Sequence, residues 1–245
     1  MSERVALVTG STSGIGAATA RRLARDGYRV AVHGRRPASQ VQALLGELEG
    51  ASYHQVDLAD VEHAGSLIEQ VVERHGRLDA LINNAGEAAR FPHADLQSAT
   101  PAVWHRMMDV NLIAPFMLIV AAESALRRSA EQGRPACVVN IGSHAGERPK
   151  GSSIPYAAAK AALHHTTRLL ALALGPSIRV NCVAPGLVDT PMAVGYDAAF
   201  ELWNGKAPMR RPAKPGDIAD LVAALCASDY VTGEIVIADG GLNLT

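Results

Sequence analysis

Short apolar runs alternate with longer amphipathic runs along the whole chain. Apolar runs at residues 4–9, 28–33, 52–56, 78–82, 137–141, 178–183 and 234–237 predict buried strands, because they are rich in aliphatic residues and bounded by turn formers. Periodic apolar positions between them predict helices that end near residues 26, 49, 75, 128, 174 and 227. This alternation favours right-handed crossovers, and therefore an α/β fold with a parallel sheet covered on both faces.

The bulk composition fits one globular domain. The chain has 245 residues, of which 48% are hydrophobic. Lys and Arg total 23 against 24 Asp and Glu, so no overall field favours nucleic acid or an anionic membrane. The longest apolar run, 112–122, falls short of the roughly 18 residues that a membrane span requires. The first residues lead into a strand without a signal-peptide pattern, so a cytoplasmic location is expected.

The cysteines and histidines form no metal-binding pattern. Cys137, Cys182 and Cys226 are scattered singly through core-like segments, which indicates reduced interior thiols. The nine histidines show no His-Glu-x-x-His or similar spacing. We therefore expect no catalytic metal.

A glycine loop, residues 10–16, separates the first strand from the first helix. Glycines at such a junction let the backbone approach a pyrophosphate, whose charge is favoured by the free N–H groups of the helix start. The spacing Gly-x-x-x-Gly-x-Gly is weak evidence alone, but its position after the first strand predicts a dinucleotide site.

The end of the second strand indicates which dinucleotide is bound. In dinucleotide-binding folds an acidic residue here holds the adenosine ribose, whereas an arginine suits a 2′-phosphate. Gly34 occupies the expected acidic position, and Arg35 and Arg36 follow. A guanidinium matches a phosphate in charge and geometry, so the pair favours NADP(H) over NAD(H). The alternative is that both arginines belong to a solvated turn.

Later strand ends carry further candidates. Parallel strands end at one edge of the sheet, so residues 57–58 (Asp-Leu) and 83–86 (Asn-Asn-Ala-Gly) are expected beside the same ligand, although the latter could be an ordinary turn. In the next helix, Pro115 removes a donor, so the carbonyl of Asn111 loses its partner and the helix should bend. That carbonyl could hold a water, or the proline could serve packing alone.

Ser143, Tyr156 and Lys160 form the candidate catalytic group. Ser143 follows the strand 137–141, while Tyr156 and Lys160 lie four residues apart on one face of the next helix. A nearby cation favours the phenolate and lowers a tyrosine pKa toward the range useful for proton transfer. Ser143 could hold a substrate oxygen beside the phenol. Taken alone, the Tyr-x-x-x-Lys pair could equally be a helix surface pair.

Residues 188–212 are expected to be irregular. The segment is rich in Met, Pro, Gly and aromatic side chains, including Met192 and Trp203. Because long insertions in compact domains are usually functional, we interpret it as a substrate lid. The same side chains could instead form a satellite core.

In sequence order, these motifs resemble the signature of the short-chain dehydrogenases/reductases, over essentially the whole chain. They are Thr9-Gly10-x-x-x-Gly14-x-Gly16, Asn83-Asn84-Ala85-Gly86, Asn111, Ser143, Tyr156-x-x-x-Lys160 and Pro185-Gly186. The resemblance implies a single Rossmann domain over residues 1–245, usually with a doubly wound seven-stranded parallel sheet. It also implies hydride transfer between a nicotinamide and a carbonyl or alcohol.

The resemblance also implies residue roles. Tyr156 would donate a proton to the carbonyl oxygen, Ser143 would position that oxygen, and Lys160 would lower the tyrosine pKa and hold the nicotinamide ribose. Asn111 would hold a relay water through its main-chain carbonyl. The implied cofactor contacts are Gly10, Ser11, Ser13, Gly14, Ile15, Gly16, Arg35, Arg36, Asp57, Leu58, Asn83, Ala85, Gly86, Tyr156, Lys160, Pro185, Gly186, Val188 and Thr190.

Within this family, the chain is most similar to the 3-oxoacyl-acyl-carrier-protein reductases. Arg134 matches a base that holds the acidic carrier, but residues 170–177 lack a second one. Arg148 and Lys150 could hold an anionic substrate or be solvated. The leading prediction is an NADPH-dependent ketone reductase, with a 3-oxoacyl thioester as one candidate substrate.

The alternatives are an NADP-dependent dehydrogenase of a sugar, polyol or steroid alcohol, and a non-catalytic NADP(H)-binding sensor. The intact set of Asn111, Ser143, Tyr156 and Lys160 argues against the sensor. A homotetramer is expected from the resemblance, and a dimer is left open.

Overall fold

The structure, a computed structural model, describes residues 4–245, so the first three residues of the predicted domain lie outside it. Its strands form one seven-stranded sheet in the order β3-β2-β1-β4-β5-β6-β7, and every neighbouring pair is parallel. The predicted doubly wound sheet is confirmed. The strands are β1 (Arg4–Val8), β2 (Tyr28–Gly34), β3 (Ser52–Gln55), β4 (Ala80–Asn83), β5 (Ala136–Ile141), β6 (Ile178–Pro185) and β7 (Ile235–Ala238).

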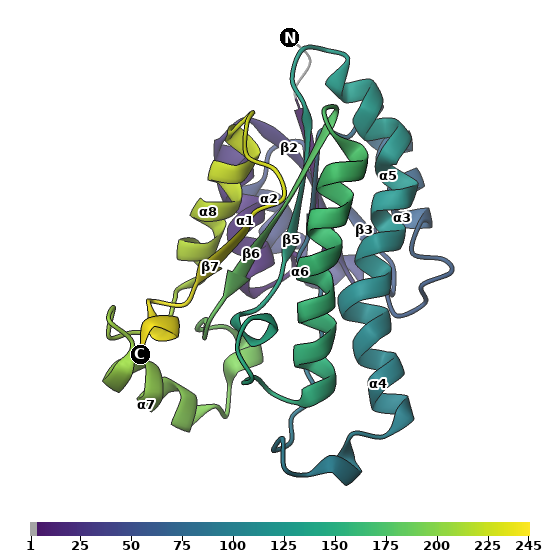
Figure 1. Cartoon of the computed structure of the whole chain (residues 1–245). Helices are drawn as coiled ribbons and strands as arrows, with labels where there is room; N and C mark the ends of the chain where they lie inside the picture. The colour runs from purple at the N-terminus through teal and green to yellow at the C-terminus, as the bar shows by residue number, and fades with distance from the viewer. Residues whose placement is uncertain (1–3) are drawn as a thin grey trace.

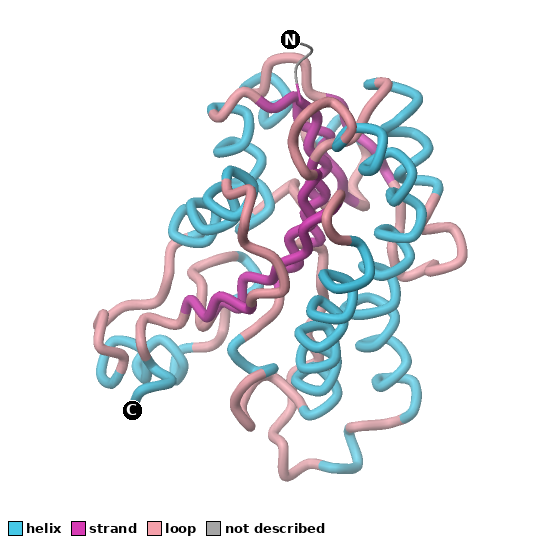
Figure 2. The backbone as a smooth tube through the Cα atoms, turned by 45° about the horizontal axis from the view of Figure 1, so that its top comes forward, coloured by secondary structure: helices cyan, strands magenta, loops and turns pink. Residues whose placement is uncertain are grey.

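Helices cover both faces of the sheet (Figure 1), and Figure 2 shows the strands as one twisted band with helices on either side. Each face buries its own aliphatic cluster, so the central strands are apolar throughout. One face carries α1 (Gly14–Arg25), α2 (Gln42–Glu47) and α8 (Pro215–Ala227). The other carries α3 (Ser66–His75), α5 (Ala114–Ala130) and α6 (Ile154–Leu174).

Two predicted helices are shorter than expected. The helix expected over residues 37–49 is divided into a 3₁₀ turn, Ala38–Gln40, and α2. The helix expected from residue 60 begins only at Ser66. Before it, Asp57 and Asp60 accept hydrogen bonds from backbone N–H groups two and three residues ahead, at 3.1 and 3.3 Å. Such local bonds compete with the helix, which delays its start.

The segment 188–212 is not irregular as predicted. It contains α7 (Asp197–Lys206), and Trp203 of this helix is buried with Ala207 and Leu242 in a small third cluster. The prediction missed α7 because this burial depends on contact with the C-terminal residues. The satellite-core interpretation is confirmed for Trp203, whereas Met192 and Met209 of the same segment are 50% and 62% exposed.

The helix predicted over 100–128 contains an interruption. α4 (Pro101–Met108) passes through a π-helical segment, Asp109–Ile113, into α5 without a break in the chain of helical turns. Among the described residues this continuous helix is the one long and apolar enough to cross a membrane by length and composition, since an 18-residue window in it has a mean hydropathy of 1.5. The apolar stretch is thus longer than the sequence run indicated. Half of that window, 50%, is buried inside the protein, and the core helix of a globular protein meets the same criterion.

Candidate active site

The loop between β1 and α1 is shaped for the close approach of a ligand. Gly10 and Gly14 have φ values of +62° and +55°, a left-handed conformation that favours glycine. A Cβ atom at Gly16 would lie 2.5 Å from the carbonyl oxygen of Gly10, so α1 packs this closely only because Gly16 lacks a side chain. The unpaired N–H groups at the start of α1 lie beside the loop and suit a pyrophosphate.

Two polar side chains hold this loop, His33, which the sequence analysis did not select, and Asn84, which belongs to the predicted 83–86 motif. His33, near the end of β2, accepts a 3.0 Å hydrogen bond from the Gly10 N–H at Nδ1 and contacts the Val56 carbonyl through Nε2, also at 3.0 Å. Asn84 Nδ2 donates to the carbonyls of Thr9 and Gly10 at 2.8 and 3.2 Å. Burial lowers the pKa of His33 to about 4, so the ring is neutral at pH 7 with its proton on Nε2. The only signal in the sequence was a histidine inside an apolar strand.

The basic residues after β2 lie at one end of the site. Arg35 donates a 3.0 Å bond to Glu87, and Glu87 also accepts two bonds from Arg106, of 2.7 and 2.6 Å. These guanidinium groups, Arg106 first, lower the pKa of Glu87. Arg36 accepts a hydrogen bond from the Tyr53 hydroxyl at its backbone carbonyl. Arg35 therefore forms an ion pair with Glu87, an acidic residue that the sequence analysis did not select.

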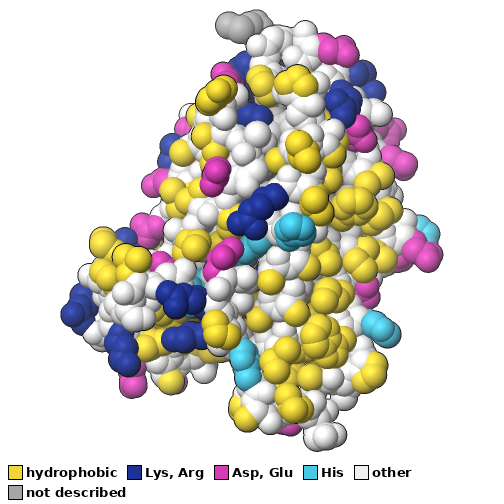
Figure 3. Space-filling model, viewed as in Figure 1, with side chains coloured by type: hydrophobic (Ala, Val, Ile, Leu, Met, Phe, Trp, Pro, Cys, Tyr) yellow, Lys and Arg dark blue, Asp and Glu magenta, His cyan; other side chains and the backbone are white. Residues whose placement is uncertain are grey.

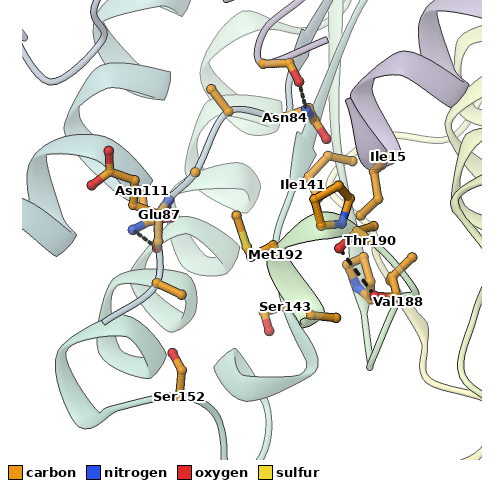
Figure 4. A pocket seen from close by; sticks show the side chains of 18 of the residues that line it. Ile15, Asn84, Glu87, Asn111, Ile141, Ser143, Ser152, Val188, Thr190 and Met192 are labelled. Atoms are coloured by element: carbon orange, nitrogen blue, oxygen red, sulfur yellow. Dashed lines mark hydrogen bonds between the residues drawn. The ribbon is translucent and has the colours of Figure 1, made fainter. Parts of the chain in front are cut away.

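Asn111 lies in the π-helical segment and is fully buried. Its side chain donates to the Glu87 carbonyl at 3.0 Å and accepts from the Glu87 N–H at 3.3 Å, and Figure 4 shows the two residues side by side. The segment ends at Ile113, two residues before Pro115, so regular α-helix is interrupted close to the proline. The predicted bend and the free Asn111 carbonyl stay predictions. Asn111 thus secures the loop after β4 beside the catalytic candidates.

Ser143 follows β5, where the chain enters a short 3₁₀ turn, His144–Gly146. Its Oγ accepts the Ala145 N–H at 3.1 Å. A hydroxyl that accepts in this way still has its own proton to donate. Ser143 is therefore oriented as a hydrogen-bond donor.

Tyr156 and Lys160 project from the first turns of α6, which Ser153 caps. Lys160 Nζ lies 5.9 Å from the centre of the Tyr156 ring and donates a 2.8 Å bond to the Ile141 carbonyl. Burial lowers the pKa of Lys160 to about 8. Burial raises the pKa of Tyr156, and a hydrogen bond with Ser143 opposes that rise. The net effect in this structure is therefore a raised tyrosine pKa, because burial of the phenol dominates, and the predicted lowering by Lys160 stays a prediction.

One cavity of about 960 Å³ joins these parts. That volume is at the upper end of ligand-binding cavities, as a dinucleotide with a small substrate requires. Most of the predicted residues line it, although they come from segments far apart in the sequence. They are Gly10, Ser13, Gly14, Ile15, Arg35, Arg36, Asp57, Leu58, Ala85, Gly86, Asn111, Ser143, Tyr156, Lys160, Pro185, Gly186, Val188 and Thr190.

Three predicted cofactor residues lie behind the cavity wall instead. Ser11 Oγ donates to the Val8 carbonyl at 2.7 Å, which ties the loop to β1. Asn83 Nδ2 donates to Asn140 Oδ1 at 2.9 Å inside the sheet. Gly16 is buried in α1. Motif spacing does not say which way a side chain points, so it could not distinguish residues that line the cavity from residues that lie behind its wall.

The segment 188–212 closes the other end of the cavity. Met192 and Tyr196 line the cavity from this segment. Arg90, in the loop after β4, donates to the carbonyls of Met192 and Val194, and its guanidinium stacks on the Tyr196 ring at 4.4 Å. This contact fastens the segment to the loop on the opposite side.

The candidate chemistry rests on organic side chains. Within residues 4–245 no group of three or more His, Cys, Asp or Glu is arranged to hold a metal ion, and a metal-free reaction stays a prediction. The three cysteines are buried and free, as predicted.

Fold and cavity together define a class of protein. A doubly wound parallel sheet with a glycine loop after its first strand binds dinucleotides at its carboxyl edge. Ser143, Tyr156 and Lys160 add proton-transfer groups to that same cavity. The arrangement is that of a dinucleotide-dependent enzyme.

Comparison with known proteins carries this further. A family model described as enoyl-(acyl carrier protein) reductase matches residues 10–243. A candidate ketoacyl reductase of the granaticin polyketide synthase from Streptomyces violaceoruber is 43% identical over 243 residues, 98% of this chain and 96% of the relative. A cis-4-hydroxycyclohexanecarboxylate dehydrogenase from Sinomonas cyclohexanicum is 36% identical over 98% of this chain and 96% of its own. The crystal structure of 3-oxoacyl-[acyl-carrier protein] reductase from Brucella melitensis in complex with NAD has a TM-score of 0.91 at 30% identity and covers 100% of this chain and 99% of that one.

The chain belongs to the short-chain dehydrogenase/reductase family, as its motifs predicted. It is an oxidoreductase that uses a nicotinamide cofactor and acts on the CH–OH or C=O group of a small molecule.

Proposed function

We propose that this oxidoreductase is an NADPH-dependent reductase that converts a ketone into a secondary alcohol. The observation that supports it best is one continuous cavity with Ser143, Tyr156 and Lys160 in one part and Arg35 and Arg36 in another. A dinucleotide with a 2′-phosphate would span these two parts.

The residues present fit such a cofactor. The Gly10 and Gly14 loop suits the pyrophosphate, for the reasons given above. A Cβ atom at Gly86 would lie 3.0 Å from Asn111 Oδ1 and 3.6 Å from Lys160 Nζ, so only glycine leaves this space free for a ribose. Once bound, the nicotinamide supplies the hydride that reduces the carbonyl carbon.

Tyr156 is the proton donor in this proposal. Burial raises its pKa, so the phenol is protonated at neutral pH, as an acid must be. Ser143 donates a hydrogen bond from its hydroxyl to the same substrate oxygen and so positions that oxygen. Lys160, whose pKa is about 8, is charged below that pH and stabilises the phenolate left behind.

Arg35 and Arg36 support NADPH over NADH, since Gly34 leaves the usual acidic position without a carboxylate. Glu87 works against this choice, because it already binds Arg35. The Brucella melitensis reductase is in complex with NAD, so family membership alone does not decide the cofactor.

The relatives favour a 3-oxoacyl thioester as the substrate. Docking of an acidic carrier protein has less support. The guanidinium of Arg134 donates to Asp229 at 2.9 and 2.5 Å and to the Ala227 carbonyl at 2.7 Å. Of Arg148 and Lys150, Arg148 is bound to Asn243 and only Lys150 lines the cavity.

A second candidate is oxidation of a secondary alcohol, in the range of sugars, polyols, steroids and other cyclic alcohols. The 36% identity to a dehydrogenase of a hydroxycyclohexane carboxylate favours it. A non-catalytic NADP(H) sensor has less support, because all four candidate catalytic residues line the cavity.

We also propose that the protein is cytoplasmic and that residues 188–212 act as a substrate lid.

The protein is further proposed to be a homotetramer that packs through α5 and α6. Hydrophobic side chains gather over the face formed by these two helices (Figure 3). Val120 is 50% exposed, Leu169 54% and Leu172 85%. Light scattering should therefore show a smaller assembly for Leu172→Glu than for the wild type, and an unchanged mass would exclude this face.

The direct test is NADPH oxidation, followed by the absorbance of the reduced nicotinamide, with a panel of ketones. The panel includes a 3-oxoacyl thioester and cyclic ketones, with NADH and the reverse reaction on the matching alcohols run in parallel. Faster turnover of a ketone with NADPH supports the proposal. Preference for NADH, or turnover only of alcohols, would contradict it.

A further inference from the structure

We propose that His164 and Glu147 form a pair that positions Ser143 for catalysis, an inference that rests on the proposed reductase function. His164 lies one helical turn beyond Lys160 on α6, and its side chain is 2% exposed. Its Nε2 accepts the Ser143 N–H at 3.4 Å, and its Nδ1 contacts Glu147 Oε1 at 2.9 Å.

The backbone around Ser143 is adapted to this ring. A Cβ atom at Gly142 would lie 2.3 Å from His164 Nε2, and one at Gly146 would lie 2.7 Å from His164 Cε1. Cβ atoms essentially never approach non-bonded atoms that closely. Both glycines that flank the turn with Ser143 therefore make room for the imidazole, which is seated directly against the backbone it contacts.

Only one state of the ring makes both contacts. The proton must be on Nδ1, where it is donated to Glu147, because Nε2 has to accept the Ser143 N–H. A protonated ring would point an N–H at another N–H, so it would release Ser143. The pair is thus specified in tautomer as well as in position.

The surrounding charges determine when that state is populated. Glu147 faces the ring from the turn after Ser143, and Lys160 and Arg168 face it from α6 itself. The Cys182 thiol of β6 also lies close to Gly142, because a Cβ atom placed there would be 2.6 Å from Cys182 Sγ. Burial lowers the pKa of His164, and Glu147 opposes that change, so the accepting form prevails at neutral pH.

Ser143 is consequently anchored at two atoms, its N–H by His164 and its Oγ by the Ala145 N–H. Its hydroxyl proton then has a defined direction toward the substrate oxygen. His164 touches no substrate in this scheme, so it is a positioning residue. Its loss should reduce kcat and leave cofactor binding intact.

The variants are His164→Leu, which removes the acceptor, and His164→Gln, which offers an amide oxygen in place of Nε2 and cannot titrate. His165→Leu is the matched control, because His165 is the exposed neighbour on the same helix. We expect kcat to fall about 100-fold in His164→Leu, the scale of a small misplacement at a reacting centre, with an unchanged Kd for NADPH. His164→Gln should recover most of the loss.

The pH profile separates positioning from simple packing. Glu147→Gln keeps an acceptor for Nδ1–H but removes the charge that raises the pKa of His164, so the acidic limb of kcat should move to lower pH. In His164→Gln that limb should disappear. Equal kcat in His164→Leu and His165→Leu, or a Glu147→Gln profile identical to the wild type, would overturn the proposal.

A readout without turnover keeps the two proposals apart. Nitrogen-15 NMR of histidine-labelled protein with NADP⁺ should show His164 as the Nδ1–H tautomer at neutral pH, assigned by comparison with His164→Gln. An Nε2–H tautomer overturns the pair whatever the activity. The Nδ1–H tautomer in a protein that reduces no ketone supports the pair and contradicts only the proposed function.

Discussion

The backbone N–H of Gly10 donates a hydrogen bond of 3.0 Å to Nδ1 of His33, so a side chain of β2 holds the loop that follows β1. The same ring contacts the Val56 carbonyl through Nε2, which links three neighbouring strand ends. Because Nδ1 accepts and Nε2 donates, this arrangement requires the neutral imidazole. The cofactor loop therefore depends on the protonation of His33.

The free energy of unfolding should fall as the solution is acidified. Burial lowers the pKa of His33 from its ordinary 6.5 to about 4, so the unfolded state binds more protons between these values. Protonation of His33 alone should lower the free energy of unfolding by about 3 kcal/mol as the pH falls from about 6.5 to about 4.

Urea unfolding of the wild type and His33→Asn across that range measures the effect. Asparagine offers an acceptor near Nδ1 but does not titrate, so the acid-dependent loss should be smaller in the variant. The difference between the two proteins isolates His33 from the other buried histidines. Identical pH dependence in both would show that His33 is not the source.

Replacing Tyr156 with Phe should abolish turnover while NADPH still binds. The phenol is the proton donor in the proposed reaction, and such donors contribute about 10²- to 10⁴-fold. Tyr230→Phe is the control, because Tyr230 is 99% exposed. Steady-state rates together with NADPH fluorescence titration measure both quantities. Appreciable activity in Tyr156→Phe would refute the proton-donor role.

Arg35 and Glu87 should affect NADPH in opposite directions. Arg35→Ala removes the proposed partner of the 2′-phosphate, so the KM for NADPH should rise while that for NADH changes little. Glu87→Gln removes the carboxylate that competes for Arg35, so NADPH should bind more tightly. In the double variant the Glu87 effect should vanish.

Calorimetric titration with 2′,5′-ADP and ADP measures these preferences without turnover. An NADPH/NADH preference that Arg35→Ala leaves unchanged would exclude the phosphate assignment.

Gly142→Ala should destabilise the protein, because the added Cβ would meet His164 Nε2 at 2.3 Å and Cys182 Sγ at 2.6 Å. Overpacking of this kind costs about 1–3 kcal/mol. Gly46→Ala is the matched control, since nothing lies within 4 Å of its Cβ position in α2, and it should raise stability by about 0.5 kcal/mol. Thermal unfolding of both variants compares them. A Gly142→Ala protein as stable as Gly46→Ala would contradict the tight seat around His164.

Much of the site was predictable because its motifs are local. The glycine loop follows a strand at once, and the spacing of Tyr156 and Lys160 places both on one helical face. The parallel sheet then brings strand ends such as Asp57 and Ser143 to one edge, so residues far apart in sequence line one cavity.

Other parts were not predictable because they depend on partners distant in sequence. Trp203 of α7 is buried in a cluster that includes Leu242, which lies 39 positions further along the chain. Asn83 looked like a cofactor residue until its bond to Asn140 showed that it faces the sheet. Tyr156 has a raised pKa because of burial, which motif spacing does not report.

The sequence by itself determined the alternation of strands with most of the helices and the identity of the catalytic candidates, because periodicity and spacing are local properties of the chain. Its motifs, taken in order, resembled the family that the comparisons then showed. Only the tertiary structure decided that His33, Glu87 and His164 belong to the site. Each acts through a hydrogen bond or ion pair to a residue at least 21 positions away. The direction and burial of such a side chain exist only once the sheet and its helices have packed.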